Sequence, residues 1–209
     1  MEKKREPIIA GLTGSIGSGK SAVAERLRAL GAGIIDADVL SRQVMSPDGS
    51  AYEAIITAFG KDILKSSGEI DRKKLGQIVF SNSELRQRLE KIVHPKVRLL
   101  FEKRLAELKN AHPPAIIIYV VPLLFESANK YPELSPTILV TAPDNVCIER
   151  VMRRDGCTRQ LAERKLAAQM PADKKAALSD IVIVNDGSME QLNRRVAELY
   201  ENLLQSRSA

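Results

Sequence analysis

Five short runs of apolar, mostly β-branched residues alternate along the chain with longer segments of helical periodicity. The runs cover residues 7–13, 33–36, 115–121, 137–141 and 181–184. The third run is almost continuously aliphatic, which is typical of a strand covered on both faces. Because strands alternate with helices, the pattern predicts an α/β fold with a five-stranded parallel sheet flanked by helices.

Two of the helical segments are well marked. The first covers residues 20–30 and places Val23, Leu27 and Leu30 on one face. The second follows the last strand and opens with Ser188 and Gln191 at the spacing of a capping box. Its apolar face consists of Leu192, Val196, Leu199 and Leu203.

Two other segments do not fit a minimal sheet. Residues 38–112 hold no strong strand pattern but several helix signals, among them a capping box from Ser81 to Glu84 and Pro95, which suits the first turn of a helix. We interpret them as a mostly helical insertion. Residues 150–178 are dense in charge and are expected to form a solvated pair of helices. Their basic residues include Arg150, Arg153, Arg154, Arg159, Arg164, Lys165, Lys174 and Lys175.

The composition narrows the class of protein. With 209 residues, 44% apolar and 28% charged, the chain is globular, as one large domain or two small ones. Two cysteines, Cys147 and Cys157, exclude a disulfide scaffold, and with two histidines they fit no zinc motif. The net charge of +6 suits a protein that handles a small polyanion, while 4% aromatic residues argue against a stacking platform for nucleic acid.

The sequence carries no membrane or export signal that we recognise. The N-terminus is charged, and no stretch approaches the ~20 apolar residues that a spanning helix requires. We therefore expect a cytoplasmic protein without a membrane partner.

A phosphate-binding sequence follows the first predicted strand. Residues 14–21 match G-x-x-x-x-G-K-[ST], and a helix is predicted from Lys20. Glycines let the backbone curl so that N–H groups point at phosphate oxygens, and the helix N-terminus adds partial positive charge. Lys20 is expected to reach the β- and γ-phosphates, and the Ser21 hydroxyl to ligate Mg²⁺. The expected nucleotide-binding set is Gly14, Ser15, Ile16, Gly17, Ser18, Gly19, Lys20, Ser21 and Ala22.

Asp36 is the candidate catalytic carboxylate. The strand 115–121 ends without the Asp that holds Mg²⁺ through water in many phosphate-loop proteins, which favours a small-molecule kinase. Asp36 ends the second predicted strand, at the sheet edge where ligands sit in open α/β folds. It could accept a proton, help to hold the metal, or serve as a helix N-cap, a role that suits Asp38 better.

Several short segments occur in one unbroken order from about residue 8 to about residue 204. They are Gly11–Ser21, Ile35–Asp38, Gly68–Arg72, His94–Pro95, Pro122–Glu126 and Asn185–Gly187. Together they closely resemble the dephospho-CoA kinase family. The phosphate loop alone is widespread, whereas P-L-L-F-E with I-D-A-D and H-P is much more specific.

The resemblance implies a reaction and three parts. ATP would phosphorylate the ribose 3′-hydroxyl of dephospho-CoA, giving CoA and ADP. A nucleotide-binding core would comprise residues 7–37, 113–144 and 179–206, with a helical substrate domain at 38–112 and a lid at 145–178.

The resemblance also implies roles for single residues. Asp36 would be the general base, and Arg150 would approach the ATP phosphates from the lid, with Arg154 as a second candidate. Asn185 and Gly187 would flank the adenine. The acceptor side would be lined by His94, Leu123, Leu124, Phe125 and Glu126.

Taken singly, some of these residues have plainer explanations. Arg150 could be surface charge, His94 a helix boundary, and Leu123 to Phe125 packing residues. The chain also departs from the common family pattern at Ser15, which replaces a glycine and which we expect the loop to tolerate, and at Val120–Val121, where an acidic residue is frequent.

Two other functions stay open on the sequence. One is a nucleoside monophosphate kinase, whose acceptor is a phosphate and needs no base. The other is a non-catalytic ATP-binding regulator, against which the intact Lys20, Ser21 and Asp36 argue. The sequence does not indicate an oligomeric state.

Overall fold

The computed structural model describes residues 6–80, 82–110, 113–126 and 131–208. The chain divides into two compact units. The sheet unit comprises residues 1–36 and 108–209, and the helical unit comprises residues 37–107.

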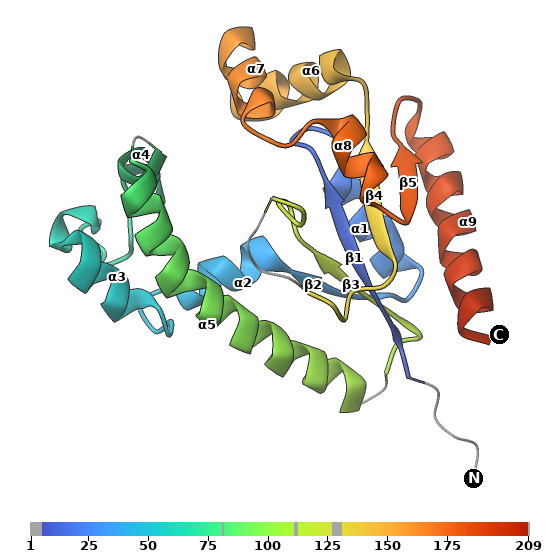
Figure 1. Ribbon diagram of the computed structural model, residues 1–209, viewed down its shortest axis with the longest axis horizontal. Coiled ribbons are helices and arrows are strands. Elements are labelled where there is room, and N and C mark those ends of the chain that lie inside the picture. Colours follow the sequence, from blue (N-terminus) through green and yellow to red (C-terminus); the bar gives the residue numbers. More distant parts are fainter. Residues whose placement is uncertain (1–5, 81, 111–112, 127–130, 209) are drawn as a thin grey trace. The chain divides into compact units, whose positions relative to one another are not determined.

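The sheet unit contains five parallel strands in the order β2-β3-β1-β4-β5 (Figure 1). They are β1 (Ile8–Gly14), β2 (Gly33–Asp36), β3 (Ile116–Val120), β4 (Thr137–Thr141) and β5 (Ile181–Val184). The predicted strands and their parallel arrangement are confirmed. Because β1 is central, the segment after it emerges at the middle of the carboxyl edge of the sheet.

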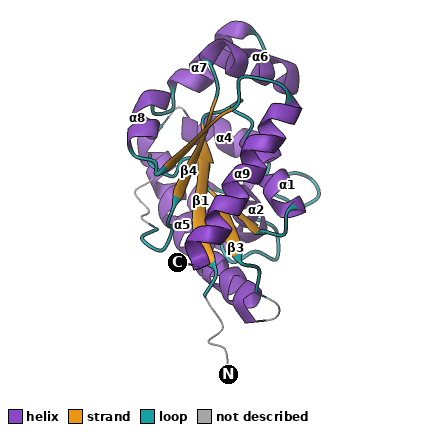
Figure 2. Ribbon diagram, turned by 90° about the vertical axis from the view of Figure 1, so that its right-hand side faces the viewer, coloured by secondary structure: helices purple, strands orange, loops and turns teal. Residues whose placement is uncertain are grey.

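One face of this sheet is covered by α1 (Lys20–Ala29) and α9 (Met189–Ser208), as Figure 2 shows from the side. Alternate strand residues point to this face, since side chains along a strand have a period of two. They pack against the helical faces expected from the sequence; buried members include Leu12, Ile118, Val140, Val23, Leu27, Leu192, Val196 and Leu203. The capping box of α9 is confirmed, because the Ser188 N–H donates to Gln191 Oε1 at 2.9 Å and the Gln191 N–H donates to Ser188 Oγ at 3.2 Å.

The charged segment near the C-terminus differs from its prediction. Instead of a solvated pair it forms α6 (Asp144–Asp155), α7 (Arg159–Ala167) and the short α8 (Ala172–Ala177), which contacts β4. Lys175 on α8 is completely buried, so its assignment to a solvated face is wrong. The reason is a buried ion pair with Glu126, which lies 49 positions away and which no local pattern announces.

The helical unit contains α2 (Ala37–Val44), α3 (Tyr52–Phe59), the 3-10 turn η1 (Lys61–Ile63), α4 (Arg72–Phe80) and most of α5 (Ser83–Asn110). Ile55, Ile63 and Phe101 are completely buried. The only β pairing among its described residues is an isolated bridge between Leu64 and Ile70. The expected mostly helical character is confirmed.

One predicted helix start is corrected. Pro95 lies inside α5, although a proline there removes a backbone hydrogen bond at a cost of about 3 kcal/mol. The helix continues because Val93, Val97 and Phe101 are buried on one face on both sides of the proline. Ser81 lies outside the described residues; Asn82 Oδ1 caps α5 by accepting the N–H groups of the second and third helical residues at 2.9 and 3.1 Å.

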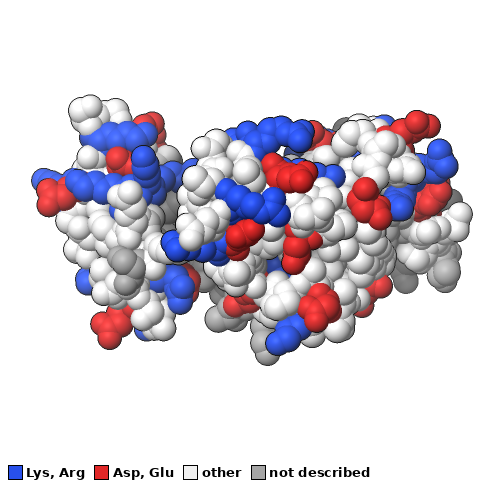
Figure 3. Space-filling model, turned by 90° about the horizontal axis from the view of Figure 1, so that it is seen from above, with Lys and Arg blue, Asp and Glu red and all other residues white. Residues whose placement is uncertain are grey.

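Charge is spread over the surface in small local pairs. Figure 3 shows Lys and Arg interspersed with Asp and Glu on one face. Several pairs are one helical turn apart, such as Arg98 with Glu102 at 2.7 Å and Arg159 with Glu163 at 3.0 Å. Exposed pairs of this kind contribute little to stability. Within the described part of the chain, no helix combines the length and apolarity that crossing a membrane requires.

Candidate active site

The phosphate loop connects β1 to α1 and needs glycine at two positions. Gly17 and Gly19 have φ values of 78° and 96°, which L side chains rarely adopt. A Cβ on Gly17 would overlap the Cys147 carbonyl oxygen, and one on Gly19 would overlap Nδ2 of Asn185. Gly19 is the N-cap of α1 and places no side chain over the helix N-terminus. The cap residue therefore leaves the N-terminus of α1 open, as an anion-binding helix terminus requires.

Ser15 is accommodated in this loop without the conformation that only glycine tolerates. It is buried, and no non-glycine residue has a positive φ among the described residues. Lys20 folds back along the loop, where its Nζ donates to the Gly14 carbonyl at 3.2 Å. Ser21 is exposed on the first turn of α1.

Two side chains hold the outer side of the loop. Nη1 of Arg150, on α6, lies 3.4 Å from the carbonyl oxygens of both Gly17 and Ser18. Nδ2 of the buried Asn185, which follows β5, donates to the same Ser18 carbonyl at 2.8 Å. The structure thus brings Arg150 and Asn185 to the phosphate loop, and Gly187 lies in the turn that leads from Asn185 into α9.

Arg154, the second candidate from α6, is engaged elsewhere. Its guanidinium pairs with Asp155 at 2.7 Å, and Lys165 of α7 reaches the same carboxylate at 2.6 Å. The hydrogen bonds from Arg154 and Lys165 hold the pKa of Asp155 well below its usual range. The three side chains join the end of α6 to α7.

Cys147 lies behind the loop and is a packing residue. It is buried, and burial is the main cause that raises the pKa of its thiol. A raised pKa disfavours the thiolate, which is the reactive form. Both cysteines are free thiols.

Asp36 stands where β2 turns directly into α2. It is half-buried and is the register partner of Val120 on β3. Its carboxylate therefore belongs to the carboxyl edge of the sheet, the edge from which the phosphate loop also emerges. His94 lies on α5 in the helical unit and is half-buried; it is not at a helix boundary.

The segment Pro122–Glu126 runs on from β3 and is tied to β1. The Val121 N–H donates to the Leu12 carbonyl at 2.9 Å, and Thr13 Oγ1 donates to the Pro122 carbonyl at 3.3 Å. Leu124 packs over the bare backbone of Gly11, so packing explains it. Leu123 is 45% exposed and Phe125 is half-buried.

Glu126 is held by the segment around α8. Its Oε1 lies 2.8 Å from Nζ of Lys175 and accepts the Met170 N–H at 3.1 Å. The adjacent Gln169 accepts the Ile16 N–H of the phosphate loop through Oε1 at 2.8 Å. Sequence reasoning missed Gln169 and Lys175, and no motif could have singled them out, because each acts on a distant part of the chain.

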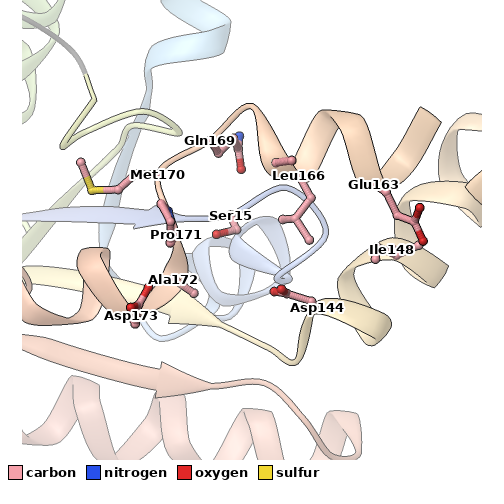
Figure 4. A pocket seen from close by; sticks show the side chains of 11 residues that line it. Ser15, Asp144, Ile148, Glu163, Leu166, Gln169, Met170, Pro171, Ala172 and Asp173 are labelled. Atoms are coloured by element: carbon pink, nitrogen blue, oxygen red, sulfur yellow. The ribbon is translucent and has the colours of Figure 1, made fainter. Parts of the chain in front are cut away.

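A pocket of about 610 Å³ lies beside the phosphate loop. Figure 4 shows Ser15 amid side chains from α6, α7, α8 and the connection between α7 and α8. The lining residues are Ser15, Asp144, Ile148, Glu163, Leu166, Ala167, Gln169, Met170, Pro171, Ala172 and Asp173. No group of three or more His, Cys, Asp or Glu among the described residues is placed to hold a metal.

The comparison with known proteins decides the family. The sequence profile of dephospho-CoA kinase matches residues 8–191. The chain belongs to the dephospho-CoA kinase family. A curated dephospho-CoA kinase of Geobacter sulfurreducens is 46% identical over 192 residues, covering 92% of this chain and 96% of the relative.

Solved structures agree with this family in fold. A protein of Thermus thermophilus superimposes with a TM-score of 0.82 at 36% identity, covering 95% of this chain and 98% of the other. The dephospho-CoA kinase of Campylobacter jejuni superimposes with a TM-score of 0.70 at 29% identity and the same coverage. The predicted fold class, a phosphate-loop kinase built on a parallel sheet, is confirmed.

Proposed function

We propose that the protein transfers the γ-phosphoryl group of ATP to the ribose 3′-hydroxyl of dephospho-CoA, giving CoA and ADP, the last step of coenzyme A biosynthesis. The proposal rests on the family match over residues 8–191, combined with a phosphate loop at the centre of the carboxyl edge of the sheet. The same match favours a hydroxyl acceptor over the phosphate acceptor of a nucleoside monophosphate kinase.

The phosphate loop binds the donor. Backbone N–H groups of the loop and the N-terminus of α1 attract the phosphate oxygens, although the Ile16 N–H is already accepted by Gln169. Lys20 exchanges its contact with the Gly14 carbonyl for the β- and γ-phosphates. Asn185 keeps the loop in shape through the Ser18 carbonyl, and with Gly187 it flanks the adenine.

Arg150 supports the transferring group. At 3.4 Å its hydrogen bonds to the Gly17 and Ser18 carbonyls are long, and a phosphate oxygen is a stronger partner for a guanidinium. Arg150 therefore turns to the phosphates when ATP is bound and stabilises charge that develops during transfer.

Asp36 acts as the general base. The 3′-oxygen attacks the γ-phosphorus, the bond from that phosphorus to the β–γ bridging oxygen breaks, and ADP leaves. The hydroxyl proton passes to the Asp36 carboxylate. Val120, the register partner of Asp36, offers no second carboxylate on the adjoining strand, which gives more weight to Asp36 as the proton acceptor.

Mg²⁺ fits this site through Ser21, whose exposed hydroxyl would supply one oxygen ligand. The ion would neutralise charge on the β- and γ-phosphates. Phosphate binding, charge stabilisation and proton transfer otherwise rest on Lys20, Arg150 and Asp36.

The remaining residues are assigned to the acceptor. Residues 38–112 are assigned as the substrate domain, and His94 is assigned to acceptor binding. In the sheet unit, Leu123 and Phe125 are assigned to the acceptor side and Glu126 orders that segment. Residues 145–178 contain the lid. The partner is a small molecule rather than nucleic acid or membrane, and the cellular location stays a prediction from the sequence.

A coupled ADP-release assay with Mg-ATP and a panel of acceptors tests the proposal. We expect efficient turnover of dephospho-CoA, much weaker turnover of adenosine and AMP, and a ribose 3′-phosphate in the product. AMP used as well as dephospho-CoA, or converted to a diphosphate, would instead support a nucleoside monophosphate kinase. ATP binding without turnover of any acceptor would support a regulator.

A further inference from the structure

The connection between α7 and α8 touches both sides of the reaction site. Gln169 accepts the Ile16 N–H of the phosphate loop at 2.8 Å, and the next residue, Met170, donates its N–H to Glu126 at 3.1 Å. Lys175 contacts the same Glu126 oxygen at 2.8 Å. Residues 169–175, here called the strap, thus connect the loop that binds the donor to the segment that borders the acceptor.

Burying the Lys175 ammonium costs more free energy than a purely structural contact requires. Its side chain is completely buried, and an ammonium in such a place loses its hydration. An apolar side chain of similar length could fill the space without that loss, and replacing buried ion pairs by apolar residues is often neutral or stabilising. What an apolar residue could not do is hold the Glu126 carboxylate at one defined position.

We propose that the strap sets the spacing between the phosphate loop and the segment Pro122–Glu126, with Lys175 and Gln169 as positioning residues for phosphoryl transfer. This inference rests on the proposed function. The attacking oxygen must lie about 3–3.5 Å from the phosphorus and in line with the leaving group, and a misplacement of about 1 Å can cost about 10²-fold in rate. One end of the strap holds the phosphate loop, which binds the donor, and the other end holds the segment Pro122–Glu126, which borders the acceptor.

The strap also limits the part of the chain that closes over the ligands. Its two ends are attached to the phosphate loop and to Glu126 by contacts within the chain itself. Closure on ATP and acceptor is then confined to residues before Gln169. The lid is therefore shorter than the expected range of 145–178.

The test compares Lys175→Met with Lys174→Met, which changes the exposed neighbour. At a temperature where each protein is folded, Lys175→Met is expected to lower kcat at least about 10-fold while the KM for ATP changes less than about 2-fold. Lys174→Met should leave both constants unchanged. A kcat for Lys175→Met within about 2-fold of the parent protein would overturn the proposal.

A double variant that removes both charges separates an effect on positioning from an effect on stability. Glu126→Gln combined with Lys175→Met removes both charges and keeps an acceptor for the Met170 N–H, so thermal stability should largely return. We expect kcat to stay at least about 5-fold low. If kcat recovers together with stability, Lys175 is structural only.

Gln169→Met tests the other end and leaves no buried charge, so it serves even if Lys175→Met does not fold. If the strap acts as one unit, the double variant Gln169→Met/Lys175→Met should lose about as much kcat as the worse single variant. Losses that multiply would show two unrelated contacts and contradict the proposal.

A readout without turnover keeps this inference distinct from the proposed function. In the parent protein, hydrogen exchange at the amides of Ile16 and Met170 should be slow with or without ligands. It should speed up at Met170 in Lys175→Met and at Ile16 in Gln169→Met, whatever acceptor the protein uses. Fast exchange at both amides in the parent protein would refute the strap even if dephospho-CoA is phosphorylated.

Discussion

Replacement of Gly19 by alanine tests how the phosphate loop is built. A non-glycine residue at φ 96° costs roughly 1–2 kcal/mol. The added Cβ also overlaps Asn185 Nδ2, which must give up its buried 2.8 Å hydrogen bond to the Ser18 carbonyl, and loss of such a bond costs roughly 1–3 kcal/mol. The sum is about 2–5 kcal/mol.

The matched control is Gly156→Ala. Gly156 is also left-handed, with φ 60°, but no atom lies within 4 Å of an added Cβ, so only the backbone cost of roughly 1–2 kcal/mol applies. The difference between the variants isolates the Asn185 contact.

Urea unfolding and ATP titration measure the two effects. We expect Gly19→Ala to be less stable than Gly156→Ala and to weaken ATP binding. If the roughly 1–3 kcal/mol of the lost contact acts on the loop alone, the loss in affinity is about 5- to 150-fold. Equal stability of the two variants with unchanged ATP affinity would refute this account of the loop.

Four further predictions concern single side chains. Lys20→Ala should fold normally and lose at least roughly 10²-fold in kcat, whereas near-full activity would contradict the phosphate-loop assignment. Asp36→Asn should lower kcat by roughly 10²–10⁴ with ATP affinity little changed; a collapse of ATP binding would make Asp36 a metal or structural group. Arg150→Met should lower kcat more than it raises the KM for ATP, and the reverse split would show ground-state binding only. Because the pKa of Asp155 is lowered on folding, its stabilisation is present above about pH 4 and is lost as the pH falls toward the lower folded value. Melting temperatures of the parent protein and Asp155→Asn should therefore converge on acidification, and a constant gap would contradict the pairing.

The sheet was predictable because its signals are local. Each strand is a short apolar run, and the phosphate loop is a contiguous sequence whose glycines are required by the backbone of those same residues. The start of α5 was not predictable in this way. A proline usually ends or begins a helix, but at Pro95 the buried face from Val93 to Phe101 outweighs the lost hydrogen bond, and that face exists only in the folded unit.

The candidate site shows the same difference between local signals and contacts that exist only in the folded chain. Arg150 and Asn185 could be proposed only through resemblance, because nothing in their neighbourhood shows that both reach the Ser18 carbonyl. Lys175 was misread because a lysine among charged residues is normally solvated, and its burial depends on Glu126.

The outer side of the phosphate loop explains why distant residues are needed at all. A loop that curls its N–H groups inward toward phosphate must turn carbonyl oxygens outward, and outward carbonyls need donors if they are shielded from water. Arg150 and Asn185 supply those donors from α6 and from the end of β5, so the loop is held by elements that lie far from it in sequence. Of these two donors, Arg150 makes the longer hydrogen bonds, at 3.4 Å against 2.8 Å for Asn185, so Arg150 exchanges its contacts for a phosphate more readily. Both side chains contact the Ser18 carbonyl, but their roles differ. Asn185 keeps the loop in shape, while Arg150 can move to the nucleotide.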